Sequence, residues 1–118
     1  MCKKTILYIE KEEFLKNMFE VPLNKRGYKL FWLNGHEDSI FRIEDLKPQI
    51  VIIDFDTVGE NSFFSYLEEV LTLPFISKNS IIVTCRPNHL ELLRKIEDKI
   101  RTSLARPIQL DQIIDLLS

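Results

Sequence analysis

Residues 49–56 read Gln49-Ile50-Val51-Ile52-Ile53-Asp54-Phe55-Asp56, in which four β-branched apolar residues are followed by two carboxylates. A strand that is apolar on both faces has to be covered on both faces, which is typical of the centre of an α/β sheet. Ligands of such sheets bind beyond the carboxyl ends of the strands, where Asp54 and Asp56 are expected to emerge. An acid at this position could also be a helix N-cap or a loop residue. The residues at the ends of the other strands distinguish these interpretations from a ligand site.

The composition is that of an ordinary globular chain. At 118 residues we expect one domain over 1–118, and a net charge of −2 with 45% hydrophobic residues indicates no bulk preference for nucleic acid or membrane. Cys2 and Cys85 lack metal-site spacing, which favours free thiols in a reducing compartment. The apolar run at 5–9 is shorter than the core of a signal peptide. These features together predict a cytoplasmic protein.

Apolar runs and helical periodicities alternate along the chain. Pro22 is expected to kink or end the first helix near Glu20, and Ser62 is a candidate N-cap for the third. The pattern predicts strands at 5–9, 28–33, 49–54, 80–84 and 102–105, and helices at 14–20, 37–46, 62–71, 87–100 and 110–117. Because crossovers between parallel strands are right-handed, this order predicts a five-stranded parallel sheet with helices on both faces.

Polar groups follow four of the five expected strands. Strands one, three, four and five end at Glu10, Asp54, Thr84 and Arg106, so carboxylates, a hydroxyl and a cation are expected at one edge of the sheet. His36 and His89 lack partners at ligand spacing and are predicted to be surface residues.

At these positions the chain resembles the receiver domain of two-component response regulators, which has a flavodoxin-like fold. The resemblance covers the whole chain. It rests on an acidic cluster after strand one, an acid ending strand three, a hydroxyl closing strand four and a cation before proline, in ILYIEKEE (6–13), IVIID (50–54), IIVTC (81–85) and LARP (104–107).

The resemblance implies a set of roles for these residues. Asp54 would be the phosphoacceptor of a histidine kinase, Thr84 and Arg106 would contact the phosphoryl group, and the bond before Pro107 would be cis. A magnesium ion would be held at the acid pair formed by positions 10 and 11, with Glu10, Asp54 and Asp56 as the carboxylates present. A divalent ion is needed there because carboxylates repel an incoming phosphoryl group.

The sequence departs from the family at several positions. Lys11 replaces the second acid, and its ammonium is expected either to fill the space of the metal ion or to turn to solvent while Glu10 and Glu12 rebuild a poorer site. The first alternative predicts a pseudo-receiver with weak magnesium binding. Further departures are Arg106 for lysine, Cys85 for a small residue, Val58 for proline and Ser103 for an aromatic residue.

The expected function is non-enzymatic signalling. By analogy, partners such as a histidine kinase or a downstream effector would bind the face built by the helices at 87–100 and 110–117, through which a homodimer could also form. Two alternatives stay open: a flavodoxin-like nucleotide or flavin binder, and a phosphatase-like hydrolase with Asp54 as nucleophile and Asp56 as acid. Against the first, the acids of 10–13 would repel a phosphate.

Overall fold

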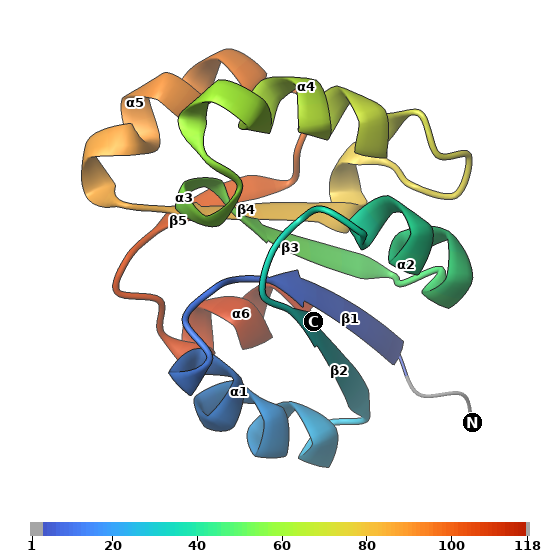
Figure 1. Cartoon of the computed structure of the whole chain (residues 1–118). Helices are drawn as coiled ribbons and strands as arrows, with labels where there is room; N and C mark the ends of the chain where they lie inside the picture. The colour runs from blue at the N-terminus through green and yellow to red at the C-terminus, as the bar shows by residue number, and fades with distance from the viewer. Residues whose placement is uncertain (1–3, 118) are drawn as a thin grey trace.

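A five-stranded parallel sheet forms the centre of the molecule in a computed structural model that describes residues 4–117 (Figure 1). The strands lie in the order β2-β1-β3-β4-β5, and each neighbouring pair is parallel. Their bounds are β1 Lys4–Ile9, β2 Tyr28–Leu33, β3 Ile50–Asp54, β4 Ile81–Cys85 and β5 Thr102–Ala105. The predicted architecture is confirmed. Within the described residues, no helix is both long and apolar enough to cross a membrane.

Helices cover both faces of the sheet. On one face lie α1 (Phe14–Lys25) and α6 (Leu110–Leu117). The other face is covered by α2 Ser39–Leu46, α3 Phe55–Val58, α4 Glu60–Leu71 and α5 Leu90–Leu93 (Figure 1).

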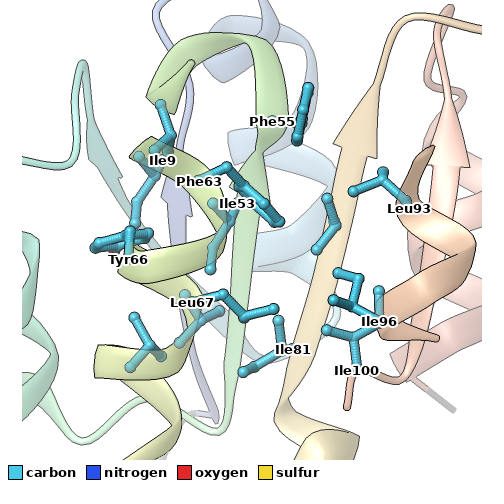
Figure 2. Packing of buried hydrophobic residues seen from close by; sticks show 14 of the residues in the cluster. Ile9, Ile53, Phe55, Phe63, Tyr66, Leu67, Ile81, Leu93, Ile96 and Ile100 are labelled. Carbon is cyan, nitrogen blue, oxygen red and sulfur yellow. The ribbon is translucent and has the colours of Figure 1, made fainter. Parts of the chain in front are cut away.

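The sheet separates two apolar cores. The apolar residues of β3 are buried on both faces, as the β-branched run predicts. Ile53 of β3 and Ile81 of β4 pack toward Phe63 and Leu67 of α4 in the larger core, which Figure 2 shows. The smaller core joins α1 and α6 to residues such as Ile52, which points to the opposite face of the same strand. This double cover fixes the register and hence the positions of the strand ends.

The first helix does not end near Glu20. It continues through Pro22 to Lys25, so the expected early end is wrong. Leu23 lies beyond the proline and is fully buried in the smaller core, as is Phe19 of the same helix. Burial of that side chain stabilises the last turn by an amount similar to the cost of an interior proline, about 2–3 kcal/mol for each.

The segment after β3 differs from the prediction. Phe55 and Asp56 do not extend the strand but open the short helix α3, and α4 begins at Glu60 rather than at Ser62. Gly59 stands between the two helices with a φ of 99° and a ψ of 145°. Because side chains with a Cβ rarely adopt this conformation, the glycine decides where the new helix begins, and Ser62 is not its N-cap.

The continuous helix expected at 87–100 is also absent. The structure has two 3₁₀ turns, Pro87–His89 and Arg94–Ile96, on either side of the single α-helical turn α5. The apolar periodicity does predict which side chains face inward, since Leu93, Ile96 and Ile100 are all buried in the larger core. Periodicity specifies which side chains face inward, but it does not separate an α-helix from a series of short turns.

Candidate functional site

Asp54 ends β3 and is fully buried at the carboxyl edge of the sheet. Its Oδ1 accepts a hydrogen bond from Thr84 Oγ1 at 2.7 Å and lies 3.1 Å from the Arg106 guanidinium. Its Oδ2 accepts from both the backbone N–H and the hydroxyl of Thr57, each at 2.9 Å. Asp54 is therefore the N-cap of α3 as well as the centre of the site, and both of its oxygens are engaged.

Glu10 follows β1 and is fully buried beside Asp54. It forms an ion pair with Arg106, and its Oε2 accepts from Glu12 N at 3.1 Å and from Thr57 Oγ1 at 3.2 Å. Burial raises the pKa of Glu10, and the neighbouring Asp54 charge raises it further against the opposing effect of Arg106. The carboxylate is thus held in place by hydrogen bonds and by a single cation.

Arg106 supplies that cation from the end of β5. Its backbone N–H donates to Cys85 O at 2.8 Å, which keeps the chain beside β4, and the Arg106–Pro107 bond is cis, as predicted. Burial alone would lower the pKa of Arg106, but the attraction of Asp54 and Glu10 outweighs burial and raises it. One guanidinium therefore lies against both buried carboxylates.

Lys11 does not take the position expected for it. Its side chain is exposed and forms no ion pair with any described residue, while its backbone N–H donates to Thr57 Oγ1 at 3.0 Å. The prediction that its ammonium fills the space of the metal ion is wrong. Of the alternative, the part in which Lys11 turns to solvent is confirmed, but Glu12 is also exposed and does not rebuild a metal site with Glu10.

Asp56 points away from the other two acids. Its Oδ2 accepts from Arg86 N at 2.9 Å, and its Oδ1 lies 2.8 Å from His89 Nδ1. The expectation that His89 lies at the surface holds in part, because its side chain is 21% exposed and packs against Phe55 with ring centroids 4.9 Å apart. His36 is likewise only half-exposed and packs against Tyr66.

The described residues do not fit a magnesium site. Nowhere between residues 4 and 117 do three His, Cys, Asp or Glu side chains gather as metal ligands. Glu10 and Asp54 are the two carboxylates that meet, and Arg106 is paired with both. The expected set of Glu10, Asp54 and Asp56 is not assembled, because helix α3 turns Asp56 toward the loop after β4.

Thr57 is the site residue that the sequence reasoning did not identify. It donates to Asp54 and Glu10 and accepts from Lys11, so it links the segments that follow β1 and β3. The available signal was the N-cap interpretation of Asp54. An N-cap side chain accepts from the residue two or three positions later, and Thr57 is the third residue after Asp54.

Comparison with known proteins gives structural neighbours only. No family model matches the sequence, and no curated protein matches it. The chain is similar to the chemotaxis response regulator CheY4 of Vibrio cholerae, with a TM-score of 0.81 and 13% identity over 98% of this chain and 96% of that one. It is equally similar in fold to a CheY-like response regulator receiver domain from Methylobacillus flagellatus, with a TM-score of 0.79 and 15% identity over 98% and 96% of the two chains.

A further neighbour is a response regulator protein from Burkholderia pseudomallei with a phosphorylated aspartic acid, a calcium ion and citrate. Its TM-score is 0.75, and the match has 19% identity over 98% of this chain and 67% of that one. At such identities the likeness concerns the fold. The chain therefore has the receiver-domain fold that the sequence predicts.

Proposed function

We propose that this chain is a receiver-type module of two-component signalling that acts through protein–protein contacts, with its acidic pocket occupied and partly neutralised by its own Arg106. The observation that carries the proposal is the pairing of one guanidinium with both Glu10 and Asp54. Asp54 is the candidate phosphoacceptor, and Thr84 and Arg106 are the candidate contacts of a phosphoryl group. The candidate partners are a histidine kinase or a downstream effector.

The arrangement disfavours phosphorylation for two physical reasons. Transfer to Asp54 needs a free carboxylate oxygen, but Thr84, Thr57 and Arg106 engage both. Transfer also needs a metal ion to neutralise the acids, and a guanidinium already paired with Glu10 and Asp54 opposes its entry by charge repulsion. We infer that magnesium binds weakly here and that phosphate reaches Asp54 slowly or not at all.

The test is the intact mass of the protein after incubation with acetyl phosphate and magnesium. The wild type and Asp54→Asn are expected to gain no phosphate, whereas Arg106→Lys gains it, because an ammonium lacks the planar fork that pairs with two carboxylates. Arg94→Lys serves as the matched control, since the Arg94 side chain is exposed and its ion pair is with the exposed Glu91 instead of with Glu10 or Asp54. Full phosphorylation of the wild type at Asp54 would overturn the proposal.

The hydrolase alternative is weakened by a specific contact. That chemistry assigns the role of acid to Asp56, but the Asp56 carboxylate is engaged by His89 and by the backbone of Arg86 instead of facing Asp54. The flavin or nucleotide alternative is weakened by Glu10, because this buried carboxylate would repel a phosphate bound after β1. We therefore infer a non-enzymatic module.

A further inference from the structure

The two edges of the sheet carry different charges. At the edge where the strands begin, each connection contributes at least one exposed cation, whereas Glu10, Asp54 and Asp56 lie at the opposite edge. In Figure 1 the strands begin on the right-hand side of the sheet. The cations at this edge are Lys4, Lys25, Arg26, Lys47, Lys78 and Arg101.

A cavity of about 310 Å³ opens at this basic edge. Lys4 and Arg101 provide its charge, and Tyr28, Ile50 and Leu117 provide apolar surface. The volume is at the lower end of the range for small-molecule pockets, which are mainly apolar with a few polar groups placed to fix the ligand. The strand starts of β1, β2 and β3 contribute to it together with the end of α6.

The polar groups of the cavity favour an acceptor-bearing ligand. Gln49 Oε1 accepts from Thr5 N at 3.1 Å, which leaves the amide N–H₂ of Gln49 as the donor end. The Leu117 carbonyl would repel an anion, but the Tyr28 hydroxyl donates to it at 2.9 Å. Lys4 Nζ lies 5.8 Å from the centre of the Tyr28 ring, which holds its charge beside the apolar wall.

The charge of Arg101 is not cancelled by a neighbouring acid. Its backbone N–H is anchored to Ile81 O at 2.8 Å, and its side chain forms no ion pair with a described residue. The nearby Lys99 does have an acidic partner, since its Nζ is 2.6 Å from Glu68. Arg101 is therefore available to a ligand, and its planar guanidinium suits carboxylate or phosphate oxygens.

We propose that this cavity binds a small organic anion, a carboxylate or a phosphoryl group attached to an apolar body. Arg101, Lys4 and the amide of Gln49 bind the anionic end, and the apolar body lies against Tyr28, Ile50 and Leu117. The cavity and the Asp54 pocket lie at opposite edges of the sheet. The proposal is thus independent of the signalling function, and either can fail without the other.

The test is a titration with phenylphosphonate, followed by backbone amide shifts in ¹H–¹⁵N NMR spectra. Its carbon–phosphorus bond cannot transfer a phosphoryl group to Asp54, so only binding is observed. We expect millimolar binding with the largest shifts at Thr5, Ile50 and Arg101. Arg101→Ala and Lys4→Ala each weaken it about fivefold, as for exposed charge pairs, and Arg94→Ala leaves it unchanged.

Further ligands separate the contributions. Phenylacetate tests the carboxylate in place of the phosphonate, and binding of either aromatic anion supports the site. If benzyl alcohol binds as tightly as phenylphosphonate, the charge of the ligand is irrelevant. If methylphosphonate binds as tightly as phenylphosphonate, the apolar wall of the cavity is irrelevant. Either result overturns the proposal, as does the absence of binding. Loss of binding in Arg106→Lys with retention in Arg101→Ala would place the ligand at the Asp54 pocket and also overturns it.

Discussion

The hydroxyl of Thr57 lies within hydrogen-bond distance of both buried acids, Glu10 and Asp54. Replacing it with valine preserves the shape but removes the donor to Asp54 and Glu10 and the acceptor of Lys11 N–H. Because hydrogen bonds to carboxylates are stronger than neutral ones, we expect Thr57→Val to lower the free energy of unfolding by about 1.5–3 kcal/mol, measured by urea denaturation.

Thr72→Val is the matched control for this substitution. Thr72 is exposed, and its hydroxyl donates to Glu69 O at a helix end rather than to a buried carboxylate. Its replacement should change stability by less than about 0.5 kcal/mol. Equal effects of the two substitutions would show that Thr57 is an ordinary capping residue with no special role in the pocket.

Glu10 makes the stability of the protein depend on pH. Burial, followed by the Asp54 charge, raises its pKa above the ordinary value of 4.5, so the folded protein binds a proton more readily than the unfolded chain. Its contribution to stability is therefore complete below pH 4.5 and is lost as the pH rises through the folded-state pKa.

The corresponding variant is Glu10→Gln, which cannot titrate. We expect its free energy of unfolding, relative to the wild type, to rise as the pH is increased above 4.5 and then to level off. Loss of the ion pair between Glu10 and Arg106 shifts the free energy of unfolding of the variant by the same amount at every pH, so it does not change the slope against pH. The measurement is urea denaturation of both proteins across this pH range. A difference that stays constant, or falls, would contradict the raised pKa.

The residues of the site were predictable in part. Glu10, Asp54, Thr84 and Arg106 could be brought together from sequence, because apolar runs locate the strand ends and parallel strands share an edge. The directions of the Lys11 and Asp56 side chains could not be predicted from the sequence. Both residues lie just past a strand end, where side chains no longer alternate between two faces. Their positions depend on Thr57 and on helix α3, which no periodicity marks.

Gly59 controls the junction between α3 and α4. Its φ of 99° and ψ of 145° suit glycine alone, and a Cβ at this position would meet nothing within 4 Å. The cost of Gly59→Ala is then conformational rather than steric, and we expect a loss of about 1–3 kcal/mol in thermal or urea unfolding. Ser62→Ala, in the first turn of α4, is the control and should be close to neutral, because Ser62 does not cap that helix.

The elements differ in how well the sequence specifies them. Strands were predicted within a residue or so, because β-branched runs between polar segments leave few alternatives. The last turns of α1 depend on burial of Leu23, a tertiary effect that overrides the propensity of Pro22. The segment 87–96 adopts short turns although its apolar spacing is helical, since the sheet fixes its buried residues without fixing its backbone.

At the scale of the whole molecule, a pocket already occupied by Arg106 predicts weak coupling to the surface. A ligand shifts a conformational equilibrium only by its differential affinity for the two states, and Arg106 already pairs with both acids and offsets part of their charge. We expect association with a partner or with itself to be the same for the wild type, Asp54→Asn and a beryllofluoride-treated sample, as measured by sedimentation.

The side of the molecule at the outer strand β5, where the segment 87–96 covers one face of the sheet and α6 the other, should carry that association. Arg94→Glu is expected to weaken it, because the Arg94 side chain is 71% exposed and opposed only by the exposed Glu91. Lys25→Glu, at the exposed end of α1, is the matched charge reversal away from this face. If beryllofluoride changes association about tenfold, equivalent to about 1.4 kcal/mol of coupling, the protein is a working phospho-switch and the proposal of a pocket blocked by Arg106 is wrong.

Arg106 directly follows β5, which is one of the two outer strands of the sheet. β5 has β4 as its single neighbour, and all four of its residues are half-buried, whereas every residue of β3 is buried. Edge segments of this kind fray and close again on their own while the centre of the sheet stays intact. We therefore expect the closed pocket to open and close with local fraying of β5, so that the acids are exposed briefly while the core stays folded.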